Sequence, residues 1–595
     1  MCRMFQPMVN LRRLTQRQIA DAMQANDDDE SLDADFADEE ESYIDDLTDS
    51  EEDHQSNFEE DSESESENED MNVDDEEVEE STVFTGKDGT EWEHEPVQWA
   101  RQQRNPNRSK LMTVTKVPGQ HFDSPFDYFN AIFSQPVIDM IVRYTNIEGR
   151  KHKANFKDVD DIEIHAFIGL LFAAGVDRSS KRNYREFYGI TRGMPLFRAT
   201  LCLTRFMELL RFLRFDDKDT RSERRKQDKL APIRDLFDMV VKNLGKMYSP
   251  GENVTIDEQL VPFRGRCSFK QYIPSKPDKY GLKIFWLVDA KNWYPLKAIP
   301  YLGRERSGAA RQTNIAKNIV LNLCQPYYKT NRTVVFDNFF SNYDTQAELQ
   351  TNGLYSVGTV RKNKKFVPPE FKPSNEREVG SNLFGFRRTC TLLSHIPRPK
   401  KSVIFLSTLH RTDRVEENGK AEINMFYNEF KGGVDVLDEL CHTYTVQRKT
   451  NRWPMAYFMN LVNVAGVAAY AMWRTANNKL DDRVKEERKN FLTRLYIELT
   501  YQQIARRSTQ GLTIGQRQSI SDILGNNTTV VEPSTSRATK KNIRRRCHIC
   551  PRSVDRKIKQ MCEVCRKNVC KQHAYSIIKC KKCQKQPVIN SSDSE

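Results

Sequence analysis

The sequence predicts a multidomain α/β protein in which a mixed sheet flanked by helices follows a helical region and precedes a cysteine-rich segment. Three observations predict this class. Short runs of β-branched and aromatic residues alternate with helical patterns between residues 252 and 365. Apolar residues recur at helical spacing before this region, and Cys and His pairs crowd the end of the chain. A chain of 595 residues is too long for one hydrophobic core, so several domains are expected.

Charge divides the chain into an acidic arm and a basic body. Residues 27–80 hold 30 acidic residues and no Lys or Arg, and such a segment cannot bury enough apolar surface to fold. The other 541 residues carry 92 basic against 54 acidic side chains, so the body is expected to bind nucleic acid. The arm is interpreted either as a solvating tail or as a competitor of DNA for the body. Residues 1–24 lack the apolar segment of a signal peptide.

The region from residue 95 to residue 251 is predicted to be helical. Its apolar residues lie three and four positions apart, as in FDYFNAIFSQPVIDMIVRYTN and DIEIHAFIGLLFAAGV. Asp161 begins the second of these segments and is predicted to be its N-cap. A later basic loop is interpreted either as a phosphate contact or as solvated surface; it contains Arg221, Arg224, Arg225 and Lys226.

The next region places carboxylates at the ends of predicted strands. The short run VTI ends at Asp257, TVVF ends at Asp337, and KGGVDVLDEL carries Asp435 and Asp438 on one helix face. Carboxylates gathered from distant segments repel one another unless cations neutralise them, as in a two-metal site. Alternatively, each Asp is a turn former or a helix N-terminal acid. Asp289 also ends a strand-like run and is the alternative carboxylate.

Basic residues alternate with aromatic ones in several segments around these acids. Cations beside stacking rings suit a polyanion that carries bases. Trp453 is interpreted either as such a ring or as a core anchor. The candidate DNA-contact residues are Arg264, Arg266, Lys276, Lys279, Arg361, Lys362, Lys364, Lys365, Arg448, Lys449, Arg452 and Trp453.

Two further segments between the acids and the tail have distinct compositions. Residues 366–424 are rich in Pro and short strand runs, which indicates an insertion that interrupts the core. Residues 455–473 are nearly all apolar, but Asn460 and Asn463 argue against a membrane span. The sequence therefore predicts a buried helix there and no transmembrane segment.

The C-terminal segment carries four ligand pairs with the spacing of zinc sites. Zn²⁺ takes four sulfur or nitrogen ligands, so eight ligands predict two structural ions. We expect interleaved, RING-like pairing, first pair with third and second with fourth. Disulfides are disfavoured inside a cell. The predicted ligands are Cys547, Cys550, Cys562, Cys565, Cys570, His573, Cys580 and Cys583.

The strings TIDEQL, FRGRC, KYG, FDNFFS, VGTVR, KGGVD and RKTNRWPMA, in this order, resemble the piggyBac family of transposases. The resemblance runs from about Phe122 to the C-terminus. It implies an RNase H-like core in which Asp257, Asp337 and Asp435 are catalytic and hold two Mg²⁺ ions, with Mn²⁺ able to substitute. Asp438 matches an additional catalytic acid. It also implies a homodimer that binds double-stranded transposon ends, forms hairpin intermediates and integrates at TTAA, with the zinc segment recognising end DNA.

The sequence thus predicts a cut-and-paste DNA transposase. Residues 540–546, KKNIRRR, indicate a nuclear localisation signal. The rival interpretations are a domesticated, non-catalytic DNA-binding protein and a two-metal nuclease without strand transfer. The expected layout begins with a disordered acidic region (1–94) and a helical dimerisation and DNA-binding domain in two parts (95–251 and 447–507). The catalytic core also has two parts (252–365 and 425–446), which an insertion (366–424) separates. A basic linker (508–546), a zinc-binding domain (547–583) and a disordered tail (584–595) follow.

Overall fold

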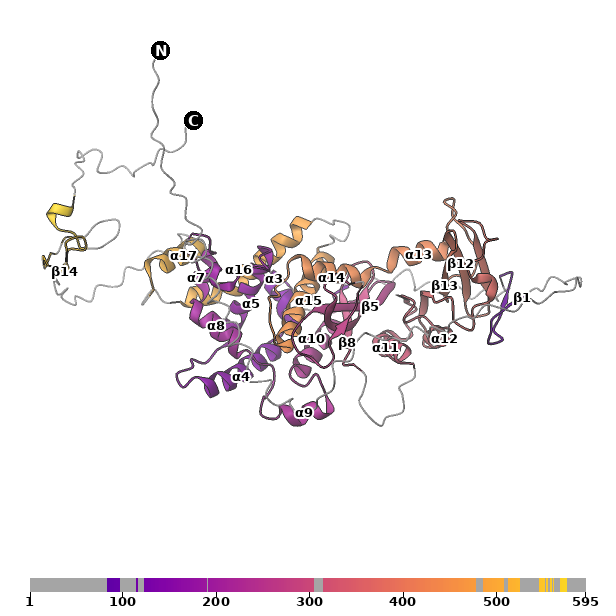
Figure 1. Ribbon diagram of the computed structural model, residues 1–595, viewed down its shortest axis with the longest axis horizontal. Coiled ribbons are helices and arrows are strands. Elements are labelled where there is room, and N and C mark those ends of the chain that lie inside the picture. Colours follow the sequence, from indigo (N-terminus) through magenta and orange to yellow (C-terminus); the bar gives the residue numbers. More distant parts are fainter. Residues whose placement is uncertain are drawn as a thin grey trace, which may run out of the picture. The chain divides into compact units, whose positions relative to one another are not determined.

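The structure is a computed structural model, shown in Figure 1. It divides into two compact units, Met1–Ile523 and Leu524–Glu595. The residues that it describes are 83–96, 114–115, 122–189, 191–274, 276–303, 314–477, 485–507, 512–524, 545–551, 553–554, 557–558, 560 and 568–574.

The first unit contains a mixed sheet of eleven strands. Its central strands lie in the order β8-β7-β5-β9-β10. The β8–β7 and β7–β5 pairs are antiparallel, whereas β5–β9 and β9–β10 are parallel. Parallel neighbours need crossover connections, and helices supply them here. These strands are β5 (Asn253–Pro262), β7 (Tyr280–Asp289), β8 (Pro295–Pro300), β9 (Thr333–Phe336) and β10 (Tyr355–Val360).

Strand β5 differs from its sequence-based expectation. The expected strand stops at Asp257, but β5 continues through that residue to Pro262 because its whole length pairs with β7. Glu258 pairs with Phe285, and Pro262 pairs with Gly281. Asp257 therefore lies within a strand rather than at its end.

The sheet extends at the β10 edge through the expected insertion. Strand β13 pairs antiparallel with β10, and β12 and β11 follow it, so this segment adds strands to the core sheet. At the far edge β2 pairs with β11, which corrects the prediction that residues 1–94 are wholly disordered. The Trp92 side chain is fully buried there, and its indole Nε1 donates to the Phe366 carbonyl at 2.8 Å. These strands are β1 (Val83–Thr85), β2 (Glu91–Glu93), β11 (Asn382–Phe386), β12 (Thr391–Arg398) and β13 (Lys401–Ser407).

A helical layer packs beside β5, and Figure 1 shows its members gathered together. Helices α15 and α16, from late in the chain, contact α3 and α5, from early in it. The layer comprises α3 (Pro125–Ile132), α4 (Gln135–His152), α5 (Asp161–Val176), α6 (Tyr184–Phe187), α7 (Pro195–Thr200), α8 (Leu203–Phe212), α9 (Arg221–Gln227), α10 (Arg234–Met247), α15 (Trp453–Ala476) and α16 (Lys485–Arg506).

Local sequence signals explain several of these helix boundaries. Ser124 and Asp127 form a capping box at the start of α3. The N-cap of α5 is Asp160, whose Oδ1 accepts from the Glu163 amide, and not Asp161 as expected. The expected basic loop around Arg221 is helix α9.

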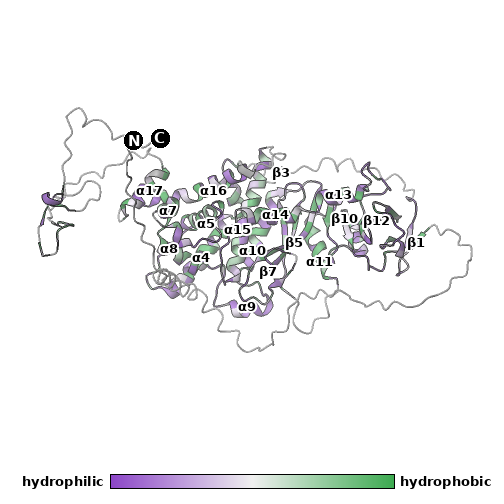
Figure 2. Cartoon of the chain, turned by 45° about the horizontal axis from the view of Figure 1, so that its top comes forward, coloured by the Kyte–Doolittle hydropathy of each residue, from purple (hydrophilic) through white to green (hydrophobic). Residues whose placement is uncertain are grey.

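Helix α15 confirms the prediction of a buried apolar helix. Within the described residues it is the helix long and apolar enough to cross a membrane, and 100% of its apolar window is buried in the fold. Figure 2 shows its hydrophobic residues among the packed helices. The remaining helices of the first unit are α11 (Ile315–Cys324), α12 (Tyr343–Thr351), α13 (Glu422–Phe430), α14 (Gly433–Thr443) and, spanning the boundary between the units, α17 (Ile514–Leu524).

Short elements complete the described residues. Strand β6 (Gln271–Tyr272) pairs with β7, and β3 (Val114–Thr115) pairs with β4 (Tyr248–Ser249). In the second unit β14 (Arg545–Arg546) pairs with β15 (Lys557–Ile558), and the 3₁₀ turn η4 covers Lys571–His573.

Candidate active site

Parallel pairing of β5 and β9 brings two predicted carboxylates to neighbouring positions. Ile256 pairs with Phe336, so Asp257 in β5 and Asp337, directly after β9, occupy the next positions along the two segments. Asp257 Oδ1 accepts from the Glu258 amide at 2.8 Å. Asp337 Oδ1 accepts from the Phe339 amide at 3.0 Å, because the chain turns immediately after β9. The register thus joins acids that are far apart in sequence.

Helix α14 brings Asp435 to the same face of β5. The Thr255 hydroxyl donates to the Phe430 carbonyl at 2.6 Å, just before the helix. A Cβ on Gly433 would meet Thr255 Oγ1 at 3.0 Å, so a glycine allows the first turn to approach the strand. Asp435 lies in that first turn with a side chain that is 64% exposed.

Mutual repulsion and burial act on these acids together. Burial raises the pKa of Asp257 well above its ordinary value, and the nearby carboxylates of Glu258, Asp337 and Asp435 raise it further. Burial, followed by the charge of Glu258, also raises the pKa of Asp337. The negative charges are therefore held close enough to disfavour one another, which is the electrostatic condition that a bound cation relieves.

Two lysines compensate part of this charge. Lys276 Nζ lies 3.4 Å from Asp435 Oδ1, so this predicted DNA contact lies beside the carboxylates. Although burial opposes it, the charges of Asp435, Asp257 and Glu258 raise the pKa of Lys276. Lys283 is 4% exposed, and its Nζ lies 3.8 Å from Glu258 Oε2. Burial lowers the pKa of Lys283.

Asp438 faces a different set of partners from the other acids. Its Oδ1 accepts from Gln259 Nε2 at 2.9 Å, and Gln259 Oε1 accepts from Trp286 Nε1 and Asn460 Nδ2. His442 Nδ1 lies 3.4 Å from Asp438 Oδ1. This buried network fixes the carboxylate relative to β5, β7 and α15.

The alternative carboxylate, Asp289, does not join the site. Its side chain is fully buried and accepts from the amides of Gly251, Lys291 and Asn292 at 2.7, 3.0 and 2.7 Å. Burial raises its pKa, while these amides oppose the rise. Asp289 thus organises the loops at the end of β7.

Several predicted DNA-contact residues have structural partners. Arg452 donates to the carbonyls of Leu210, Arg211 and Leu213 at the end of α8. Trp453 packs edge-to-face on Phe269, with ring centroids 5.1 Å apart, as a core anchor does. Arg448 donates to nearby carbonyls, and Lys364 is half-buried. The exposed candidates are Arg264, Arg266, Lys279, Arg361, Lys362, Lys365 and Lys449.

Two of the four basic residues predicted around Arg221 form ion pairs that hold helix α9 in the fold. Asp216 is buried and binds both Arg221 and Arg224, with nitrogen–oxygen distances of 2.5 Å. Arg225 is exposed, and Lys226 pairs with Glu223 at 2.8 Å. Half of this cluster therefore anchors α9.

Sequence reasoning missed the supports around the acids. No local pattern marks Gln259, Asn460 is interpreted only as an argument against a membrane span, and Lys283 is not among the predicted site residues. A signal for Lys283 existed, because it is the one charged residue within the otherwise apolar run of β7 before Asp289. A lone cation on a strand buried on both faces requires a partner.

In the second unit, one predicted set of zinc ligands comes together. Cys547, Cys550, Cys570 and His573 offer ligand atoms that all lie within 4.8 Å of one another. The Cys550–Cys570 Sγ distance is 3.7 Å, and His573 Nδ1 lies 3.3–3.7 Å from the three sulfurs. Zn–S bonds of about 2.3 Å in a tetrahedron give edges of about 3.8 Å, so this donor set fits zinc.

This set is the expected pairing of the first and third pairs. The other predicted ligands, Cys562, Cys565, Cys580 and Cys583, lie outside the described residues. The expected interleaving of two ions therefore stays a prediction.

Comparison with known proteins identifies the class. A sequence model described as "Transposase IS4" matches residues 124–470, and the chain therefore belongs to the transposases. Its fold matches a cryo-EM structure of the piggyBac transposase synaptic complex with hairpin DNA. The TM-score is 0.69 with 32% identity, covering 79% of this chain and 100% of that one. The chain is a piggyBac-like transposase.

Two human proteins that are similar in sequence to this chain support the same family. PiggyBac transposable element-derived protein 3 from Homo sapiens is 23% identical over 395 residues, covering 59% of this chain and 63% of that protein. The human Chimeric ERCC6-PGBD3 protein is also 23% identical, with 35% of its length covered. The match thus spans less than two thirds of either relative.

Proposed function

We propose that this chain is an active cut-and-paste transposase that excises a DNA element and integrates it at TTAA. The observation that carries the proposal is the convergence of Asp257, Asp337 and Asp435 on one face of the mixed sheet. An RNase H-like core is supported by three antiparallel strands followed by two parallel ones, with acids on the first and fourth in chain order. The solved relative is a synaptic complex with hairpin DNA, which supports hairpin ends and paired subunits here.

The carboxylates suit hard divalent cations. Oxygen ligands with open positions are what Mg²⁺ prefers, and Mn²⁺ accepts the same set. Asp257, Asp337 and Asp435 would hold these ions, whose chemistry lowers the pKa of water and stabilises the leaving oxygen. The repulsion that raises the pKa of Asp257 is relieved by the same charge.

The chain's own groups would position the DNA around this centre. Asp438, fixed by Gln259, would orient the helix face that presents Asp435. Lys276 is placed to exchange its carboxylate contact for a phosphate of the strand being cut. The exposed cations of the Arg361–Lys365 loop would contact flanking or target DNA.

The second unit would recognise transposon-end DNA through a RING-like zinc fold, and the basic segment before it would direct the protein to the nucleus. The zinc part rests on the clustered Cys and His ligands. The localisation rests on KKNIRRR.

The decisive experiment is an excision assay in cells with a plasmid that carries the candidate transposon ends. Asp257→Asn, Asp337→Asn and Asp435→Asn should each lower excision by about a thousandfold, because losing a metal ligand costs several kcal/mol in the transition state. Scarless repair at TTAA should accompany wild-type excision. Glu439→Gln, on the exposed side of α14, is the matched control and should retain activity.

The thermal midpoint of each variant distinguishes a loss of catalysis from a loss of folding. Because burial and repulsion oppose the Asp257 charge, Asp257→Asn should keep or raise the thermal midpoint while abolishing excision.

A wild-type protein that binds end DNA without excision would instead support the domesticated, non-catalytic interpretation.

A further inference from the structure

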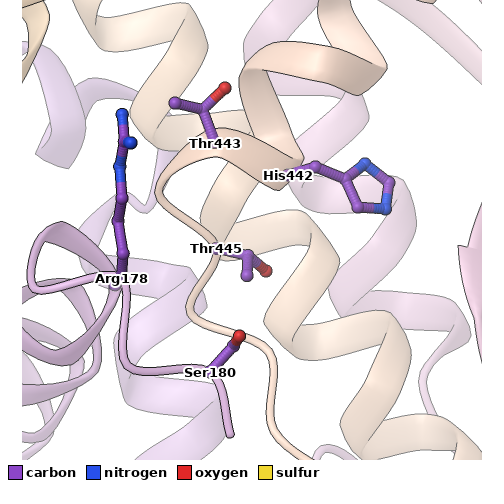
Figure 3. Close-up of a pocket in the computed structure, with 6 residues that line it drawn as sticks. Arg178, Ser180, His442, Thr443 and Thr445 are labelled. Carbon is purple, nitrogen blue, oxygen red and sulfur yellow. The ribbon is translucent and has the colours of Figure 1, made fainter.

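An open cavity of about 290 Å³ lies beside the end of α14 (Figure 3). A neighbouring hollow of about 520 Å³ shares Arg178 and adds Lys489 from α16. The walls come from α5, α14 and α16, so segments distant in sequence build them. The cavity is lined by Gly175, Arg178, Ser180, His442, Thr443 and Thr445.

Close backbone packing gives this cavity fixed walls. A Cβ on Gly175 would meet the carbonyl oxygens of Tyr444 and Thr445 at 2.6 and 3.0 Å. Two guanidinium groups, those of Arg178 and Arg488, each lie 5.2 Å from the centroid of the Tyr444 ring. Arg488 is buried and donates to the Leu440 carbonyl of α14. The last turn of α14 is therefore held against α5 and α16.

Arg178 occupies a backbone position that favours glycine. It follows Asp177, the C-cap of α5, with φ of +52°, and its amide donates to the Gly175 carbonyl at 2.9 Å. Helices usually place glycine at this left-handed position, because a Cβ is strained there. An arginine that tolerates this strain points to a use for its side chain.

The positive charges at this cavity are open to a ligand. Among the described residues, no carboxylate forms an ion pair with Arg178 or Lys489, and both side chains are exposed. The nearby acid Asp177 is instead engaged by the Ser179 hydroxyl and by Arg182. Figure 3 shows the His442 ring directed away from Arg178, and its nitrogens face Asp438 and Asp278.

We propose that Arg178 and Lys489 bind a backbone phosphate of the DNA strand that leads away from the carboxylates, with the Ser180 hydroxyl as a neutral donor. The inference rests on the proposed function and adds a strand-positioning site to it. His442 at the cavity lies seven positions after Asp435 on α14, or roughly 10 Å at the helical rise. At about 3.4 Å per nucleotide, the bound phosphate lies about three nucleotides from the cleavage point.

The test measures binding of a short fluorescein-labelled DNA duplex across a salt series, without divalent cations. Each lost phosphate contact should reduce the slope of log K against log salt by about 0.9. Because Arg178 and Lys489 share one phosphate, Arg178→Gln and Lys489→Gln should each reduce the slope by part of this amount, and the double variant, which removes the whole contact, by about 0.9. Lys181→Gln removes the same charge from an exposed neighbour outside the cavity and should leave the slope near that of the wild type.

The Arg178→Gly variant distinguishes a role of Arg178 in binding DNA from a role in stabilising the fold. Glycine relieves the left-handed strain, so this variant should weaken DNA binding while its thermal midpoint stays equal to or above that of the wild type. If Arg178 served only to stack on Tyr444, the midpoint would fall and binding would not change.

The remaining outcomes distinguish the two proposals. Wild-type binding and excision with unchanged salt slopes in Arg178→Gln and Lys489→Gln would overturn the phosphate site alone. Failure of the wild-type chain to bind any duplex would overturn the proposed function and this site together.

Discussion

Single residues around the carboxylates show how the fold tolerates concentrated charge. The Nζ atom of Lys283 lies 4.9 and 5.3 Å from the ring centroids of Phe285 and Phe339, and beside Glu258. It thereby links β5 to the turn that carries Asp337. This buried ammonium offsets the negative charge of Glu258, Asp257 and Asp337.

The clearest pH-dependent residue is His442. The hydrogen bond and charge of Asp438, helped by Asp278, raise the pKa of His442 from 6.5 to about 9. A raised histidine pKa stabilises the folded state fully below pH 6.5, and this stabilisation is lost as pH rises through about 9. The imidazole is 40% exposed, so solvent screening limits the effect to about 1 kcal/mol or less.

His442→Gln should therefore have a lower thermal midpoint than the wild type at pH 6 and about the same midpoint above pH 9. Thermal unfolding measured across this range checks the prediction. Asp278→Asn should reduce the difference only partly, since Asp438 is the main cause. A midpoint difference that does not vary with pH would contradict the assignment.

At the scale of elements, the β1–β2 hairpin changes the boundary of the folded unit. Its Trp92 packs with Phe366, Phe371 and Leu392 in one hydrophobic cluster under β11–β13. The Asp88 amide donates to the Lys365 carbonyl at 3.4 Å, so the hairpin also contacts the basic loop after β10. The acidic arm at residues 27–80 is thus followed closely by an anchored segment.

Trp92→Ala should destabilise this end of the sheet by about 3–5 kcal/mol, because it removes a fully buried indole. Hydrogen exchange should accelerate in β11, β12 and β13 while β5 and β7 keep their protection. Phe84→Ala, at a partly buried position against the same cluster, is the graded control and should have a smaller effect. Uniform exchange changes across the sheet would show that the hairpin supports the whole core.

At the scale of the molecule, the two units differ in the size of their apolar cores and in their metal-binding side chains. The first unit has an extensive apolar core around α5 and α15. The described part of the second unit has few buried apolar residues and one cluster of Cys and His side chains whose spacing fits a metal ion. We therefore propose that the second unit takes its folding free energy from a bound ion.

Removal of zinc with a strong chelator should therefore unfold the second unit and leave the thermal transition of the first unchanged. Elemental analysis should give about two zinc ions per chain, as eight predicted ligands imply. Cys550→Ser should remove one ion, and Cys565→Ser the other. Retention of both ions in either variant would refute the predicted ligand sets.

The sequence alone determined the mixed α/β class, the transposase family and the buried nature of α15, because strand runs, motif strings and apolar length are local signals. The spacing of the Cys and His pairs also predicted zinc ligands, and the RING-like expectation that Cys547 and Cys550 join Cys570 and His573 is confirmed by their clustering. Asp257, Asp337 and Asp435 could be proposed because each stands out within its own segment.

Only the tertiary structure decided which acids meet and what surrounds them. The parallel register of β5 and β9 sets Asp257 beside Asp337 and extends β5 beyond its expected end, whereas Asp289 turns to backbone amides. Likewise, Trp92 finds its partners hundreds of residues away. Such pairings depend on strand register and on contacts between distant segments, which no local pattern of side chains encodes.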